Sequence, residues 1–121
     1  MRLFALRGAN SVERDEPQQI LDATTELMLE ITRRNGLEPS RTVSCIFTAT
    51  GDLTSEFPAV AARAIGFDRV PLLCAQEIPV PGSMPCVIRV LIHYYADEDH
   101  EPDHVYLGET KALRADLHAA Q

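Results

Sequence analysis

Apolar positions recur with a helical period in one stretch of the chain, between Asp15 and Gly36. Spacings of three and four residues place these side chains on one face of a helix. Asp15 is the expected N-cap, Pro17 suits a first turn, and Gly36 suits the left-handed position that ends a helix. The members of the apolar face are Ile20, Leu21, Thr24, Leu27, Met28 and Ile31.

Elsewhere, apolar and β-branched runs bounded by glycine, proline and charged residues predict strands. The predicted strands are residues 2–8, 42–49, 70–77, 86–95 and 104–107. A short helix is expected at residues 58–65, and a loosely helical tail after Gly108. This order predicts a mixed β-sheet with packed helices, of the α/β (α+β) class. At 121 residues the chain is expected to form a single domain, residues 1–121.

Composition narrows the possible partners. The net charge of −7 argues against nucleic acid, which requires a basic footprint, and against an anionic membrane surface. No apolar run is long enough to span a bilayer, and Arg7 follows the start too soon for a signal-peptide core. The three cysteines show no Cys-x-x-Cys spacing and are expected to be free thiols. We therefore expect a cytoplasmic protein that binds neither nucleic acid nor membranes.

Arg89 is the most informative polar residue. It interrupts a strand that is apolar at residues 87–88 and 90–92. A strand apolar on both faces is usually covered on both faces. A guanidinium there cannot lose its proton, so its burial requires a carboxylate or a bound anion. Arg89 thus indicates either a structural arginine, ion-paired or reaching solvent at a sheet edge, or a ligand site, and the pattern alone leaves both open.

Other candidate residues have an ordinary structural interpretation when each is taken alone. Arg7 ends a strand, and Arg63 lies on the short helix, so both are expected to be solvated charges. Glu77 ends an apolar strand, where it pairs with an arginine or orients a substrate hydroxyl. Cys74 has no Cys-His signature to make it a nucleophile. Tyr106 alternates with apolar residues and fits a core position.

Metal and cofactor motifs are not found in the sequence. His93, His100 and His104 have carboxylates nearby, but Pro102 disfavours a helix that would align the last two. There is no glycine-rich phosphate loop and no Gly-x-Ser-x-Gly sequence. We expect no metal site and no cofactor.

Several segments, in their order along the chain, resemble the monofunctional chorismate mutases of the trimeric, Bacillus-like class. The resemblance extends over residues 2–117, and the RGA…VERD string with CAQE and IRV is its specific part. The matching segments are LRGANSVERD at 6–15, TATGDL at 48–53, FPA at 57–59, Arg63, VP at 70–71, CAQE at 74–77, IRV at 88–90, HVYL at 104–107 and LRADL at 113–117.

The resemblance implies a homotrimeric pseudo-barrel with sites between adjacent subunits. It implies conversion of chorismate to prephenate without a cofactor, on the route to phenylalanine and tyrosine. Arg7, Glu77 and Arg89 match the catalytic positions. The substrate-binding positions are matched by these three and by Tyr106, by Phe57, Ala59 and Arg63 from a neighbouring subunit, by Leu73 and Cys74 near Glu77, and by Leu113 and Arg114 in the C-terminal segment.

Two positions depart from the family pattern. Val60 stands where a lysine is familiar, which removes a positive charge from the pocket rim. Leu73 stands where a threonine is familiar, which removes a hydrogen-bonding group. Two other functions stay open: an enamine/imine deaminase-like trimer that also holds a carboxylate with an arginine, and a non-enzymatic carboxylate-binding regulatory module.

Overall fold

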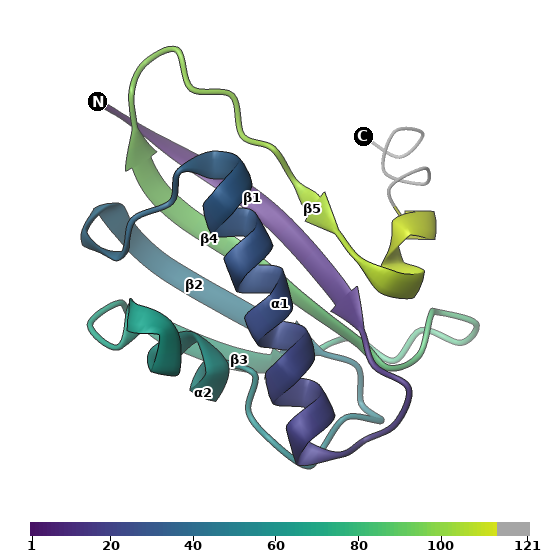
Figure 1. The fold of residues 1–121 in the computed structure, drawn as a ribbon. Helices are drawn as coiled ribbons and strands as arrows, with labels where there is room; N and C mark the ends of the chain where they lie inside the picture. Colours follow the sequence, from purple (N-terminus) through teal and green to yellow (C-terminus); the bar gives the residue numbers. More distant parts are fainter. Residues whose placement is uncertain (114–121) are drawn as a thin grey trace.

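A computed structural model describes residues 1–113. The strands are β1 (Arg2–Ser11), β2 (Thr42–Ala49), β3 (Leu72–Gln76), β4 (Val87–Ala96) and β5 (Val105–Tyr106). They form one mixed sheet in the order β3-β2-β4-β1-β5 (Figure 1). β4 runs antiparallel to both β1 and β2, whereas the β1–β5 and β2–β3 pairs are parallel. The expected α+β class is confirmed.

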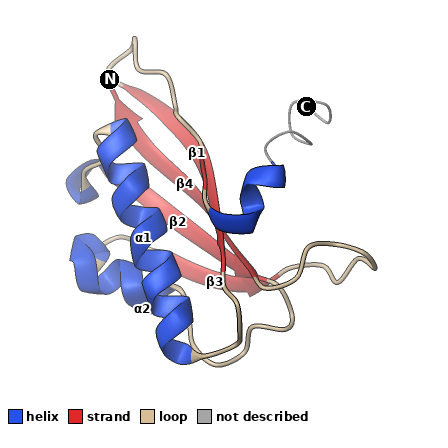
Figure 2. Ribbon diagram, turned by 45° about the vertical axis from the view of Figure 1, so that its right-hand side comes forward, coloured by secondary structure: helices blue, strands red, loops and turns tan. Residues whose placement is uncertain are grey.

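The helices α1 (Pro17–Asn35) and α2 (Ala59–Ala62) lie on one side of this sheet (Figure 2). Leu27 and Ile31 of α1 are fully buried against the sheet with Leu6 and Phe47. Burying side chains of this size contributes roughly 1.5–3 kcal/mol each, and this packing holds helix and sheet together. Gly8 is part of the fit, because a Cβ there would lie 2.8 Å from Ile31 Cδ1.

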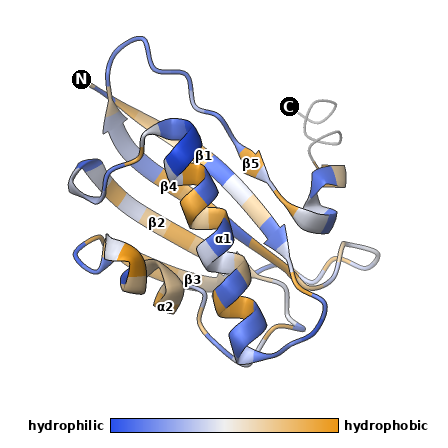
Figure 3. Ribbon diagram, in the orientation of Figure 1, coloured by the Kyte–Doolittle hydropathy of each residue, from blue (hydrophilic) through white to orange (hydrophobic). Residues whose placement is uncertain are grey.

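The opposite face of the sheet is open in the single chain. Side chains that alternate with the core positions point to this open face, and many are apolar. Leu3 is 49% exposed and Leu73 is 61% exposed. Figure 3 shows hydrophobic stretches along β2 and β3, whereas the connection between β4 and β5 is mostly hydrophilic. The helices cover only one face of the sheet. The apolar sequence of β4 predicts that both faces are covered, so the cover of the second face must come from outside these helices.

Most predicted elements are confirmed, with shifts at their ends. α1 ends at Asn35 and is capped by the predicted Gly36, whose φ of 61° lies in the left-handed region. The predicted N-cap at Asp15 is wrong: Glu16 takes that place and makes no side-chain cap. Gln19 Oε1 instead accepts hydrogen bonds from the backbone N–H groups of Glu13 and Arg14, which leaves Asp15 free for another contact.

The predicted helix at 58–65 is two elements. α2 is followed by a π-helical turn, η2 (Arg63–Phe67), in which Ile65 and Gly66 leave helical geometry. Gly66 has φ 112°, a conformation that a side chain would strain. Two short 3₁₀ turns, η1 (Pro39–Arg41) and η3 (Gly108–Thr110), precede β2 and follow β5. None of the helices within residues 1–113 is long and apolar enough to cross a membrane.

Candidate active site

Arg89 lies on the open face of the sheet, near the start of β4. In the strand register it is opposite Ala9 of β1 and Thr48 of β2. Its Nε lies 3.1 Å from Glu77 Oε2, and its side chain is 41% exposed. Nε is buried and, within the described residues, its N–H makes no well-aligned hydrogen bond, so the contact with Glu77 is an ion pair. The guanidinium thus has a carboxylate partner and still reaches solvent, with donors available to a ligand.

Glu77 is held in place by two contacts from β2. The Thr48 hydroxyl donates a 2.7 Å hydrogen bond to Glu77 Oε2. The backbone N–H of Glu77 donates to the carbonyl of Ala49 at 2.9 Å. With its side chain only 18% exposed, the carboxylate is fixed next to Arg89. Sequence reasoning missed Thr48 as a site residue, because only the strand register shows that it is opposite Arg89.

A cavity of about 240 Å³ lies around Arg89 and is lined by two other predicted polar residues, Arg7 and Tyr106. Arg7, Arg89 and Tyr106 line this cavity together with Thr48 and Ile46. Tyr106 is 8% exposed, and the backbone N–H of Arg7 donates to His104 Nδ1 at 3.0 Å. Two arginines and a tyrosine therefore line one largely apolar cavity, with the Glu77 carboxylate paired to Arg89, and this set of groups suits a small anion.

A second and larger cavity, of 280 Å³, contains none of these arginines. It is formed by residues 53–58 and 74–76, and includes Phe57 and Cys74. Leu73 pairs with Ile46 and points to the open face, whereas Cys74 pairs with Phe47 of the core. The structure therefore does not bring Leu73 and Cys74 to one floor within the single chain.

The predicted wall residues lie away from the arginine cavity of their own chain. Phe57 is 65% exposed, and Arg63 is exposed at the junction of α2 and η2. Ala59 is 4% exposed, so its side chain is used in the core of its own chain. Leu113 is half-buried at the end of the described chain, and Arg114 lies outside the described residues.

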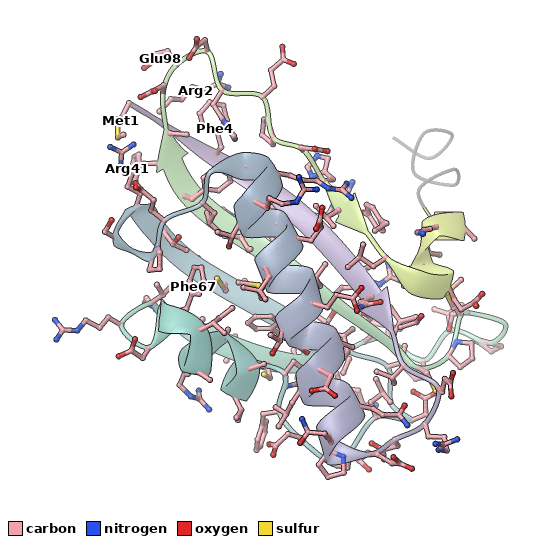
Figure 4. The ribbon with its side chains drawn as sticks, viewed as in Figure 1. Met1, Arg2, Phe4, Arg41, Phe67 and Glu98 are labelled. Carbon is pink, nitrogen blue, oxygen red and sulfur yellow. The ribbon has the colours of Figure 1, made fainter. Side chains whose placement is uncertain are left out.

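The acidic residues at 97–103 are at the far end of β4 from Arg89. Glu98 lies 3.8 Å from the N-terminal amine, and Figure 4 shows it beside Met1 and Arg2. The eight strand residues from Arg89 to Ala96 span roughly 25 Å. This distance is about three Debye lengths at physiological salt, so the charge of this acidic segment does little to repel an anion from the cavity. Among residues 1–113, no cluster of three or more His, Cys, Asp or Glu side chains could hold a metal ion.

The fold and this cavity define a class: an α+β chain that presents arginines and a paired carboxylate on the open face of its sheet. Comparison with known proteins narrows the class. The profile described as chorismate mutase type I matches residues 3–117. The chain therefore belongs to the type I chorismate mutase family.

Individual relatives agree with this assignment. The chain is 52% identical over 118 residues to chorismate mutase AroH of Thermus thermophilus, covering 96% of this chain and 97% of that protein. It is 38% identical over 119 residues to chorismate mutase AroH of Bacillus subtilis (strain 168), covering 97% and 94%. A solved chorismate mutase from Clostridium thermocellum has a TM-score of 0.87 and 42% identity, over 90% of this chain and 98% of that one.

Proposed function

We propose that the chain catalyses the rearrangement of chorismate to prephenate at the cavity around Arg89. The observation that carries the proposal is the meeting of Arg7, Arg89 and Tyr106 in one cavity, with Glu77 3.1 Å from Arg89. Membership of the type I chorismate mutases supplies the substrate, a compact dianion. It places the reaction on the route to phenylalanine and tyrosine.

The reaction is an intramolecular Claisen rearrangement, in which one C–O bond breaks while one C–C bond forms. It needs no proton transfer, hydride or covalent enzyme intermediate. The protein has two tasks: it selects the compact, pseudo-diaxial shape of the substrate, and it stabilises the ether oxygen as that atom becomes partly negative. Fixed donors in an apolar cavity perform both tasks, and no cofactor enters the proposal.

Each polar residue has a role in this scheme. Arg89 donates to the ether oxygen and to the side-chain carboxylate of chorismate. Arg7 and Tyr106 hold the same carboxylate, and Glu77 accepts from the ring hydroxyl. The ion pair with Glu77 orients the guanidinium before the substrate arrives, so little reorganisation is needed during the reaction.

The active unit in this proposal is a homotrimer with sites between subunits. Two observations support it. The sheet has an open and largely apolar face, on which Leu73 is 61% exposed. Phe57 and Arg63 are exposed and do not line the arginine cavity of their own chain, so they are available to a neighbour. Leu73, Cys74 and Leu113 complete the proposed substrate contacts, as does Arg114.

Val60 leaves this proposed site with one positive charge fewer than the familiar pattern. Arg7, Arg63 and Arg89 remain to attract the dianion. We propose further that residues 1–121 form one catalytic domain acting in the cytoplasm.

A direct test follows the loss of chorismate absorbance with purified protein and no added cofactor. Turnover to prephenate is the expected result. Absence of turnover by folded protein contradicts the proposal, and binding of an aromatic amino acid without turnover supports a regulatory module instead. An enamine/imine deaminase would release ammonia from its substrate, and it would leave chorismate unchanged.

A further inference from the structure

Asp15 makes a set of contacts that its place in the sequence does not predict. It lies in the connection between β1 and α1, yet its carboxylate binds a loop 39 residues further along the chain. Asp15 Oδ1 accepts from the backbone N–H groups of Thr54 and Ser55, each at 3.0 Å, and from the Ser55 hydroxyl at 2.7 Å. Asp15 Oδ2 accepts from the Thr54 hydroxyl at 3.0 Å. One side chain therefore receives four hydrogen bonds from two consecutive residues.

The loop that Asp15 binds leads directly to Phe57. Residues 54–57 line the 280 Å³ cavity together with Cys74. Phe57 is 65% exposed, so its ring has little packing to fix its direction. Its own backbone N–H donates to the adjacent Glu56 carboxylate at 2.8 Å. The direction of the Phe57 ring therefore depends on the shape of the preceding loop.

We infer that Asp15 is a positioning residue, which holds the loop at residues 54–57 so that Phe57 forms a wall of the substrate site. The inference rests on the proposed function, because that function makes Phe57 a substrate contact. Asp15 itself touches no reacting atom. It acts through Thr54 and Ser55.

The chemistry of the contact suits a carboxylate. Only an ionised carboxylate offers acceptor positions on two oxygens without bringing a donor of its own. Hydrogen bonds to a charged acceptor are also stronger than those between neutral groups. In agreement, the pKa of Asp15 lies below its usual value, with the Ser55 hydroxyl as the largest cause and the Thr54 hydroxyl as a further one. The alternative role, capping α1, is excluded because Glu16 takes the N-cap position.

The test compares Asp15→Ala with Asp22→Ala. Asp22 is a matched control, because it is an exposed aspartate of α1 that accepts a single hydrogen bond from Gln18. Both variants remove one negative charge, so the change in net charge is the same in both. Asp15→Asn is the conservative variant: its amide oxygen keeps the acceptor for the two backbone N–H groups, while the charge and the second acceptor oxygen are lost.

Two measurements are made on each variant: amide hydrogen exchange of Thr54 and Ser55, and steady-state kinetics with chorismate. In Asp15→Ala we expect exchange at these two amides to rise about tenfold or more, because the loop loses its closing contact. We expect KM to rise about tenfold with kcat within about twofold, because the wall contributes binding while the arginine cavity stays intact. Asp15→Asn should fall between Asp15→Ala and wild type, and Asp22→Ala should match wild type in both measurements.

Unchanged exchange in Asp15→Ala overturns the inference, whatever the activity. Faster exchange with a KM equal to that of Asp22→Ala overturns it as well, because the loop then has no part in binding. If Asp15→Ala does not fold, the same two measurements on Asp15→Asn and Ser55→Ala test the inference, since each of these variants removes only part of the contact. If wild-type protein does not turn over chorismate, the proposed function fails, and the exchange rates alone then decide whether Asp15 holds the loop.

Discussion

The Thr48 hydroxyl donates its hydrogen bond to Oε2 of Glu77, the same oxygen that lies 3.1 Å from Arg89 Nε. One carboxylate oxygen therefore links β2, the end of β3 and the most informative arginine of β4. A carboxylate free to rotate would let the guanidinium turn with it. The hydroxyl restricts that rotation, and in the proposed mechanism it thereby fixes the donors aimed at the substrate.

Thr48→Val should lower kcat while leaving the fold intact. Valine keeps the β-branched shape that suits a strand, but it cannot donate to Glu77. Loss of one net hydrogen bond of about 1 kcal/mol corresponds to a fall of about fivefold in kcat. Thr42→Val is the matched control, because it removes a hydroxyl bonded to the Glu38 carbonyl at the other end of β2. Equal kcat values for the two variants would show that the Thr48 bond does not matter to the reaction.

Arg89→Lys should lower kcat far more than Thr48→Val does. Lysine keeps the positive charge but lacks the planar pair of donors that reaches an ether oxygen and a carboxylate together. Loss of one preorganised donor costs about 3–4 kcal/mol, which corresponds to about 10²–10³ in kcat. Substitution of Arg89 by citrulline separates the effects, since citrulline keeps the shape and loses the charge. Near-wild-type turnover by Arg89→Lys would exclude Arg89 from the role proposed here.

The sequence alone shows that Arg89 is a permanent charge in an apolar strand, which is either compensated by an anion or exposed to solvent at a sheet edge. It does not identify Glu77 as the carboxylate that lies beside Arg89. The pairing depends on the parallel register of β2 and β3 and the antiparallel register of β2 and β4. Periodicity along one strand shows which residues share a face, but it carries no information about which neighbour lies alongside. Thr48 was missed for the same reason.

Local signals also fail where a tertiary contact competes with them. Asp15 has the residue type and the position expected of an N-cap. Its carboxylate instead accepts hydrogen bonds from Thr54 and Ser55. The prediction of Gly36 as the helix end is correct, because a left-handed residue after a helix is a local requirement. The end of the short helix at Ile65, before Gly66, was predicted, but the π-helical turn at Arg63–Phe67 was not, since a short helix gives too few positions to show a change of period.

Leu3→Glu should dissociate the proposed trimer. Leu3 is 49% exposed on the open face and lies opposite Tyr95, which is 45% exposed. A carboxylate forced into an apolar interface without a partner costs several kcal/mol, so the dissociation constant should rise by about 100-fold or more. Sedimentation velocity measures the change. Leu29→Glu is the matched control, because Leu29 is 54% exposed on α1, on the other side of the sheet.

The two variants separate the sheet face from general surface charge. If Leu3→Glu and Leu29→Glu sediment alike, the open face is not the interface. If the wild-type chain sediments as a monomer, the proposal of sites between subunits fails, and Phe57 and Arg63 lose their assigned place.

Stability should fall at alkaline pH because of Tyr94. Its ring is 1% exposed, and burial raises its pKa to about 12 from an ordinary value near 10. Below pH 10 the hydroxyl is neutral in the folded and the unfolded chain, so it adds no pH dependence. Between pH 10 and 12 the unfolded chain ionises and the folded chain does not, which favours unfolding. The free energy of unfolding should therefore decrease by about 1.4 kcal/mol per pH unit, or about 3 kcal/mol in all.

Urea unfolding from pH 8 to pH 12 measures this decrease, and Tyr94→Phe should remove the part of the slope that belongs to Tyr94. The variant also loses the 2.6 Å contact with His100, so its stability at pH 8 is expected to be lower than that of wild type. Only the change of slope tests the pKa.

Tyr95→Phe, which removes a hydroxyl from an exposed ring, is the matched control for the loss of one tyrosine. Buried Cys45, with a pKa raised to about 12, adds a decrease of the same sign that remains in both variants. A wild-type slope in Tyr94→Phe would show that the hydroxyl titrates alike in the folded and unfolded chains.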